Sequence, residues 1–251
     1  MKITIIGSGN AATVLAKLCV QQGHSIVQII SRNEEKGKNL AQNFNAQYIP
    51  LNGTVNKNIE IVLVAITDSV FPKALDGLNF GSIPVFHTGG AVSMNVLRNT
   101  TTNYGVLYPL QSLSAEVEEI PTIPFLIEAN SENSFKILNE FANTLSNNVT
   151  KVLEFKRLRL HAAAAIANNF TNYLYTCAKT YCDNEELDFN LLKPLILETA
   201  NRIQNNDPEK VQTGPAKRQD VYTLGKHLQL FSEYPKLRTL YTRMTESIMH
   251  G

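Results

Sequence analysis

The sequence predicts a doubly wound, mostly parallel α/β sheet followed by an all-α domain. Two observations carry this prediction. Short β-branched runs alternate with segments of helical period through residues 1–154, a pattern typical of parallel sheets covered by helices. After about Phe155 the apolar period becomes helical and no further strand is indicated. We therefore expect two domains, 1–154 and 155–251, packed directly together around a cleft, because no flexible linker separates them.

Composition narrows the classes of function. The chain has 251 residues and a net charge of +1, so electrostatics give no reason to expect nucleic acid or an anionic membrane as partner. The three cysteines lack C-x-x-C spacing and indicate neither disulfides nor a metal site. No apolar run is long enough to span a bilayer, and the chain opens on a strand rather than a signal peptide. We expect a cytoplasmic protein with a small-molecule substrate.

The opening stretch carries the strongest motif. A β-branched run ending at Ile6 is followed by a G-x-G-x-x-A pattern and then by apolar residues at helical spacing. Small residues in this context permit a tight turn and close approach of a pyrophosphate to the amino end of a helix. The residues expected to cradle the diphosphate are Gly7, Ser8, Gly9, Asn10 and Ala11. The alternative is a glycine turn that binds nothing.

The second predicted strand, from Ser25, ends at Ser31 and Arg32, about 20 residues after the glycine motif. NAD-binding domains usually place a carboxylate here to bind the ribose hydroxyls, whereas a serine and an arginine suit a 2′-phosphate. Arg32 therefore favours NADP over NAD. The alternative is a solvated arginine at a helix start.

The strand predicted over 59–66 should end beside the dinucleotide, because ligands lie beyond the carboxyl ends of parallel strands. Ala65, Ile66 and Thr67 are the expected contacts, and Asp68 or Ser69 can cap a helix beginning near Val70.

The next predicted strand, 83–86, runs into His87 and Gly89. At the carboxyl end of a central strand, His87 could lie against the nicotinamide and donate a proton to a forming alkoxide or amine. Gly89 would allow close approach of the cofactor or substrate. The alternative is a histidine that only holds local backbone.

The remaining elements before Phe155 are a helix over 34–44, strands near 47–49, 104–112, 122–127 and 149–153, a short helix from about 93 and an amphipathic helix over 131–145. Together with the strands described above, these elements give about eight strands. Tyr108 and Gln111 could line the same cleft.

A long helix is predicted over 156–182. At 100° per residue, His161, Asn168 and Asn172 fall on one stripe within about 20° of each other. Buried polar groups need partners, and the partner is either a substrate or cofactor or another helix of the same bundle.

Three more helices are predicted, over 190–204, 221–231 and 234–249. The turn before the second of them holds Arg218, whose planar fork suits a carboxylate or phosphate, and Asp220, a helix cap; the alternative is a solvent loop in which the two pair.

Together these stretches resemble a Rossmann-like oxidoreductase family whose C-terminal half is known only as a domain of unknown function. That family is related to pyrroline-5-carboxylate reductase, to deazaflavin-dependent NADP reductases and to the 6-phosphogluconate dehydrogenase superfamily. The resemblance rests on residues 7–12, 87–90, 108–111, 162–170 and 213–220. It implies an N-terminal NADP-binding domain, a helical C-terminal domain and a homodimer built on those helices.

Two departures from the family concern the chemistry. Superfamily dehydrogenases often place a catalytic lysine four residues before an asparagine; here Asn169 has Ala165 in that position. Tyr108 stands where many closer members have histidine.

The leading hypothesis is an NADP-dependent oxidoreductase that transfers hydride to a small carbonyl or imine. His87 or His161 would donate the proton, Asn168 or Asn169 would orient the substrate, and Arg218 would hold its carboxylate. The rival hypothesis is a catalytically silent NADP-binding sensor or partner-binding dimer.

Overall fold

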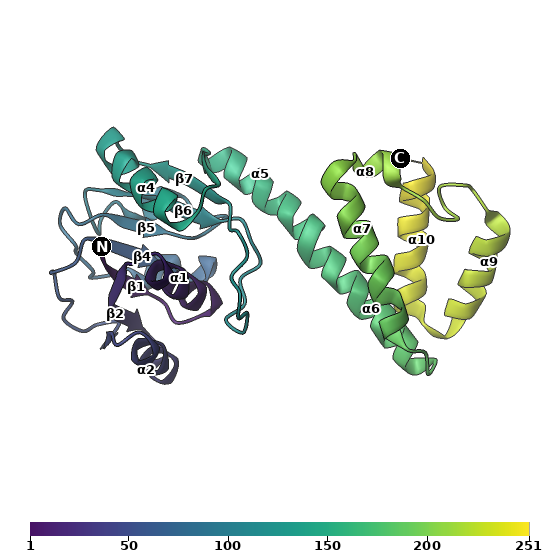
Figure 1. Cartoon of the computed structure of the whole chain (residues 1–251), viewed down its shortest axis with the longest axis horizontal. Helices are drawn as coiled ribbons and strands as arrows, with labels where there is room; N and C mark the ends of the chain where they lie inside the picture. Colours follow the sequence, from purple (N-terminus) through teal and green to yellow (C-terminus); the bar gives the residue numbers. More distant parts are fainter. Residues whose placement is uncertain (251) are drawn as a thin grey trace. The chain divides into compact units, whose positions relative to one another are not determined.

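The computed structural model describes residues 1–250, without the side chains of Pro72 and Lys73. It divides into two compact units, the first covering Met1–Asn169 and the second beginning at Phe170 (Figure 1). Among the described residues no helix combines the length and apolar character needed to cross a bilayer.

One eight-stranded sheet forms the first unit, in the order β3-β2-β1-β4-β5-β6-β7-β8. Its strands are β1 (Lys2–Ile6), β2 (Ser25–Ser31), β3 (Gln47–Pro50), β4 (Ile61–Val64), β5 (Val85–His87), β6 (Tyr104–Pro109), β7 (Phe125–Ala129) and β8 (Val149–Lys151). The chain leaves β1 in one direction across the sheet for β2 and β3, and in the other for β4 and β5. This reversal beside β1 leaves a crevice at the carboxyl ends of β1 and β4, where such sheets bind their ligands.

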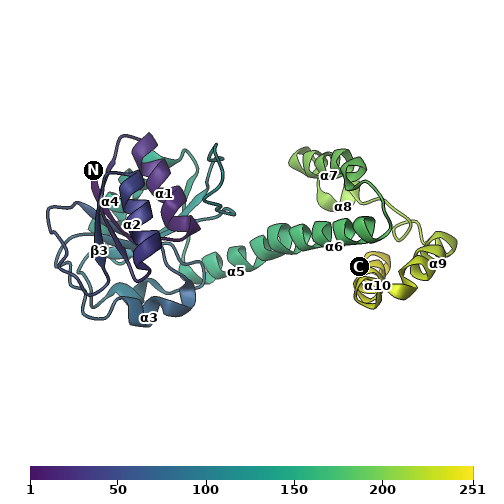
Figure 2. The same cartoon turned by 90° about the horizontal axis from the view of Figure 1, so that it is seen from below.

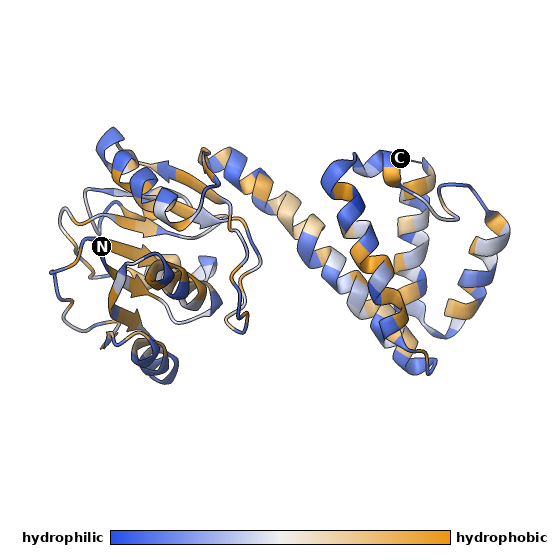
Figure 3. Cartoon of the chain, in the orientation of Figure 1, coloured by the Kyte–Doolittle hydropathy of each residue, from blue (hydrophilic) through white to orange (hydrophobic). Residues whose placement is uncertain are grey.

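Helices cover both faces of the sheet (Figure 2). Apolar residues of α1 (Asn10–Gln21), α2 (Glu34–Asn43) and α4 (Glu132–Leu145) share one buried cluster with the sheet. On the other face, α3 (Phe71–Ala74) and the 3₁₀ turn η2 (Met94–Leu97) pack in a second cluster. The strands are almost continuously apolar (Figure 3), as expected for strands buried on both faces. The predicted fold class is confirmed.

The pair β6–β7 is antiparallel, with Val106 opposite Glu128, whereas the other strand pairs are parallel. The connection from Leu110 to Pro124 contains no helix. A parallel neighbour requires a crossover, usually helical, while a plain loop suits an antiparallel return.

The long predicted helix is formed by α5 (Glu154–Ala164), a π-helical segment η3 (Ala165–Phe170) and α6 (Thr171–Asn184). A π-helical turn holds more residues than an α-helical one, so residues after Ala165 leave the 100° register. The assumption that placed His161, Asn168 and Asn172 on one stripe is therefore wrong across this segment. Arg157 and His161 tie α5 to β7 and β6, and the first unit ends inside the long helix, beyond the point where strands stop.

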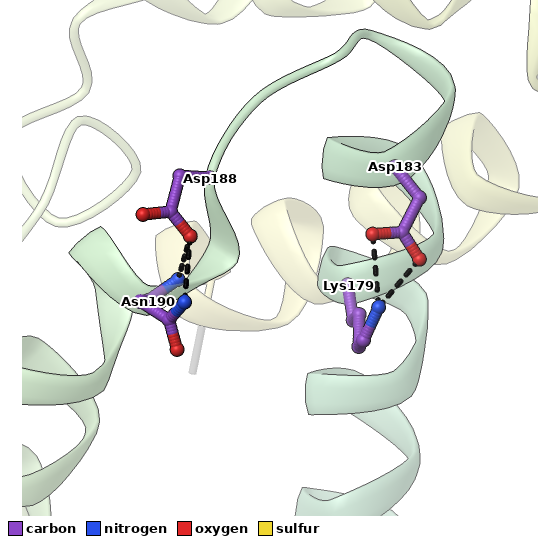
Figure 4. Close-up of polar contacts among 4 residues, drawn as sticks. All are labelled: Lys179, Asp183, Asp188 and Asn190. Carbon is purple, nitrogen blue, oxygen red and sulfur yellow. Dashed lines mark hydrogen bonds and ion pairs between the residues drawn. The ribbon is translucent and has the colours of Figure 1, made fainter.

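The second unit consists of helices joined by short turns: α6, η4 (Phe189–Leu192), α7 (Lys193–Asn205), α8 (Pro208–Val211), α9 (Val221–Leu230), η5 (Phe231–Glu233) and α10 (Pro235–His250). Near the end of α6, Lys179 pairs with Asp183 one helical turn later, and beyond the helix Asp188 accepts hydrogen bonds from the backbone and side-chain nitrogens of Asn190 (Figure 4). As predicted, Asp220 caps α9 by accepting from the Thr223 amide.

Candidate active site

A groove of about 930 Å³ lies in the first unit, at the carboxyl ends of β1, β2 and β4. It brings together ten of the residues that the sequence singled out for the cofactor: Gly7, Ser8, Gly9, Asn10, Ala11, Ser31, Arg32, Ala65, Ile66 and Thr67. It does not reach His87 or Gly89, which the sequence placed at the same site.

The glycine turn has the geometry that a diphosphate site needs. Gly7 has a φ of +128°, and a Cβ there would collide with the carbonyl oxygen of Ala65. A side chain at this position would therefore separate the turn from the end of β4. Gly9, by contrast, has no atom within 4 Å of where its Cβ would stand. That open space lies where a phosphate oxygen would approach the backbone.

Helix α1 begins directly at this turn. No side chain caps its first N–H groups, and Asn10 and Ala11 in its first turn line the groove. Unpaired amides and the positive end of the helix dipole favour an anion at this place. The residues present therefore fit the diphosphate of a dinucleotide.

Hydrogen bonds hold the far wall of the groove in place. The hydroxyls of Ser8 and Ser31 are 2.7 Å apart, which ties the glycine turn to the end of β2. Asn33 caps α2 by accepting from the Lys36 amide at 2.9 Å.

Two exposed cations, Arg32 and Lys36, line this end of the groove. The nearby carboxylate of Glu34 lies 2.6 Å from the ammonium of Lys38. A 2′-phosphate on the adenosine ribose would thus meet two positive side chains. Lys36 was missed in the sequence, although its place in the first turn of the helix that follows Arg32 is a usable signal.

His87 is fully buried at the end of β5, edge-on to Phe71. Its Nδ1 accepts a hydrogen bond from the Gly89 amide at 3.0 Å. Burial lowers its pKa to about 3, and the charge of Arg157 acts in the same direction while the Ser93 carbonyl opposes it. A histidine that is neutral at pH 7 and sealed from solvent holds the turn after β5 and is poorly suited to donate protons.

A different histidine, His161, contacts the turn after β5. His161 on α5 is half-buried, and its Nδ1 lies 2.7 Å from the hydroxyl of Tyr108 at the end of β6. The two rings also make an edge contact. A Cβ on Gly90 would stand 2.5 Å from the same Nδ1. The imidazole therefore packs between a hydroxyl and a bare stretch of backbone.

This cluster is connected to the groove through Asp68. Its carboxylate accepts from the Ala91 amide at 3.1 Å, which fastens the turn after β5 to the turn after β4. Thr67 and Ser69, on either side of Asp68, line the groove. Burial and the charge of Asp68 raise the pKa of Tyr108, opposed by Arg157, so the phenol stays neutral.

An ion pair anchors α5 beside this cluster. The guanidinium of Arg157 is buried, donates to Glu128 on β7 at 2.6 Å and to the Val92 carbonyl at 2.7 Å. Arg157 precedes His161 by four residues, so both lie on the same face of α5. The ion pair that holds Arg157 therefore also holds His161 in position.

The other residues predicted for catalysis are separate from this cluster or not placed against it. Asn168 and Asn169 are exposed in the π-helical segment, with the Asn168 amide 3.3 Å from the Asn169 side-chain oxygen. Arg218 is exposed in the turn before α9, in the second unit. Its charge lowers the pKa of Asp220, behind the larger effect of hydrogen bonds from Thr223.

Comparison with family models covers both units. Residues 2–83 match the model described as NADP oxidoreductase, coenzyme F420-dependent, and residues 123–248 match a domain of unknown function, DUF2520. No curated protein sequence matches the chain.

Solved structures match over nearly the whole length. A provisionally named NADP oxidoreductase from Bacteroides fragilis is 36% identical, with 100% of this chain and 98% of that one covered and a TM-score of 0.91. The 1-pyrroline-5-carboxylate reductase of Streptococcus pyogenes is 14% identical, with 99% and 98% covered and a TM-score of 0.65. A reductive aminase from Aspergillus terreus, in complex with NADPH and ethyl-5-oxohexanoate, is 14% identical, with 98% and 94% covered and a TM-score of 0.60. The last two likenesses show the fold alone.

The family model over residues 2–83 and the 36% identical structure from Bacteroides fragilis place the chain among the NADP-dependent oxidoreductases. More narrowly, the chain belongs to the family that joins an NADP oxidoreductase domain to the C-terminal domain of unknown function DUF2520.

Proposed function

We propose that this protein reduces the C=O or C=N bond of a small substrate with hydride from NADPH. The observation that carries the proposal is the groove, in which an open glycine turn and helix end lie opposite Arg32 and Lys36. Two neighbours that share this fold are named as a pyrroline-5-carboxylate reductase and a reductive aminase, so the substrate panel that tests the proposal includes imines beside carbonyl compounds.

The bound NADPH would supply the hydride, and the chain would supply orientation and the proton. Between the two predicted donors, the geometry favours His161 over His87. His161 is half-buried on α5, whereas His87 is sealed in the sheet with its pKa lowered to about 3. Asn168 and Asn169 remain the proposed orienting residues, and Arg218 the proposed partner of a substrate carboxylate.

The rival function is a catalytically silent NADP sensor. Ala165, four residues before Asn169, stands where related dehydrogenases have lysine, and this observation favours the rival. NADPH oxidation with a panel of small aldehydes, ketones and cyclic imines separates the two. Turnover that is lost in His161→Gln supports the reductase; the absence of turnover with every compound, despite tight NADPH binding, supports the sensor.

The nucleotide preference tests the groove itself. We expect NADPH to bind more tightly than NADH, and Arg32→Ala or Lys36→Ala to weaken NADPH binding by roughly ten- to a hundredfold, as the loss of a charged hydrogen bond predicts. Fluorescence titration at fixed, moderate salt measures both. Lys38→Ala is the matched control, because Lys38 is on the same helix, pairs with Glu34 and does not line the groove. Equal loss in the control, or no preference for NADPH, would contradict the phosphate site.

We also propose that the second unit forms a homodimer through its helices. Among its described residues, the buried apolar side chains are Cys182, Ala216 and Leu224, while Leu191, Leu195 and several others are more than half exposed. Exposed apolar area of this extent is typical of an interface. Sedimentation equilibrium of the full chain should give twice the monomer mass; a monomer at micromolar concentration would contradict the proposal.

A further inference from the structure

The contact between Tyr108 and His161 has no role in the function proposed above. The two residues are 53 positions apart in sequence, on β6 and α5, yet their hydroxyl and Nδ1 lie within 2.7 Å. The described residues give the other ring nitrogen, Nε2, no hydrogen-bond partner. One side of the imidazole is therefore held, and the other is available to a ligand.

Three further contacts hold this arrangement. Tyr108 is almost entirely buried, so its hydroxyl has little freedom to leave His161. The bare backbone of Gly90 forms a wall against the imidazole. Arg157, one helical turn before His161, locks α5 to β7 through Glu128.

The place of the pair is also significant. Its wall at Gly90 is one residue from Ala91, which hydrogen-bonds Asp68, and the neighbours of Asp68 line the dinucleotide groove. Because Arg32 and Lys36 follow β2, the adenosine end of a dinucleotide would lie beside that strand. Its nicotinamide end would then lie toward the strands on the other side of β1. Tyr108 lies near the carboxyl end of one of those strands, β6, and Gly90 follows another, β5.

We propose that Tyr108 is a positioning residue that holds His161 so that Nε2 is the atom that delivers the proton during reduction. This inference rests on the proposed function. In the imidazolium both nitrogens carry protons, and the hydroxyl of Tyr108 accepts from Nδ1–H. As hydride reaches the substrate carbon, the electron pair of the C=O or C=N bond moves to oxygen or nitrogen. That atom takes the proton from Nε2, whose N–H bond breaks, and the imidazole is left neutral with Nδ1–H still bound to Tyr108. Water then returns a proton to Nε2.

The charged groups around the pair suit this role. Burial and the carboxylate of Asp68 raise the pKa of Tyr108, and Arg157 opposes them. The oxygen of a neutral phenol can accept a hydrogen bond from Nδ1–H, both in the imidazolium and in the neutral imidazole that remains after Nε2 has given up its proton.

Two variants of the full chain perturb the pair in different ways. Tyr108→Phe removes the hydroxyl and keeps the ring contact. Gly90→Ala keeps both side chains and places a methyl group against Nδ1, which must push the imidazole off Tyr108. Gly225→Ala is the control, because a Cβ there meets no atom within 4 Å.

With the best substrate from the carbonyl and imine panel, we expect Tyr108→Phe and Gly90→Ala to lower kcat by on the order of ten- to a hundredfold, as loss of effective general-acid catalysis implies. NADPH affinity should stay within about twofold, and Gly225→Ala should match the wild type. ¹⁵N NMR of histidine-labelled protein with NADPH, assigned with His161→Gln, should show that the neutral imidazole carries its proton on Nδ1. Tyr108→Phe should lose this bias.

The outcomes separate this inference from the function on which it rests. If the wild type turns over no compound, the reductase function fails and this inference with it. If the wild type is active and Tyr108→Phe changes neither kcat nor the protonated nitrogen, only the positioning role is overturned. A fall in NADPH affinity equal to the fall in kcat would also overturn it, since a structural defect would then explain both.

Discussion

The two units of this chain bury their apolar residues to very different extents. The first has two large clusters of buried side chains, one on each face of the sheet. In the second, three apolar side chains are buried among the described residues, and Leu191 is 77% exposed. Figure 3 shows apolar residues distributed along the helices of the second unit, whereas in the first unit they are concentrated in the strands.

This difference indicates how each unit is stabilised. Ordering a residue costs roughly 1–2 kcal/mol of conformational entropy, which buried apolar area must offset. The first unit has that area within one chain. The second has the local signals of helices, such as the Asp220 cap, but buries few apolar side chains of its own, and the homodimer proposed above would supply that burial. Three predictions test this comparison.

The largest expected effect concerns one ion pair in each unit. Arg157→Ala leaves Glu128 without its partner inside the first unit and should cost about 3–5 kcal/mol of unfolding free energy. Lys179→Ala breaks a pair in the second unit whose side chains are each 57% exposed, and should cost at most about 0.5 kcal/mol. Urea denaturation followed by circular dichroism measures both. Equal costs would show that the buried pair contributes no more than a surface pair, and Arg157→Lys provides a milder variant if Arg157→Ala does not fold.

The second comparison uses the same substitution in both units. Leu138 is fully buried in α4, so Leu138→Ala should cost about 3 kcal/mol at any protein concentration. Leu191→Ala should cost little in dilute protein and more as the concentration rises, because its partner would be a second chain. Thermal melts across a hundredfold range of concentration test this. A Leu191→Ala penalty that is large and independent of concentration would contradict an intermolecular partner.

The sequence predicted most of the fold because the signals are local. β-branched runs and helical periods are set by neighbouring residues, and all eight strands and the main helices were identified. The direction of β7 was not, because period and burial are the same for parallel and antiparallel pairing. The sign of an antiparallel return that the sequence did offer was the absence of a crossover helix between Leu110 and Pro124. The π-helical segment was missed because Ala165–Phe170 contains no glycine or proline that would distinguish it from an ordinary α-helix.

The candidate site was predictable only where a motif is contiguous. The glycine turn and Arg32 lie in short segments with a known spacing. Burial of His87 and the pairing of Tyr108 with His161 depend on contacts between distant strands and helices, which a single sequence does not encode locally. His87 and His161 were therefore equal alternatives in the sequence and become distinguishable through burial and hydrogen bonding.

The smallest expected effect is a pH dependence that belongs to the first unit. His87 has a pKa of about 3 when folded and an ordinary value of 6.5, so the unfolded chain binds a proton that the folded chain does not between these values. Stability should therefore rise with pH across this window and be lost as pH falls below about 6.5. From pH 7.5 to pH 5 the loss attributable to His87 is roughly 2 kcal/mol.

Comparison of the wild type with His87→Gln isolates this contribution. The variant keeps an acceptor for the Gly89 amide but cannot titrate. Burial also lowers the pKa of His24, and His24 is present in both proteins, so its effect cancels in the difference. Urea midpoints at the two pH values should fall farther for the wild type, in the transition that reports the sheet. An equal fall in both proteins would mean that the imidazole at position 87 is not held neutral, and it would return to consideration as the proton donor in place of His161.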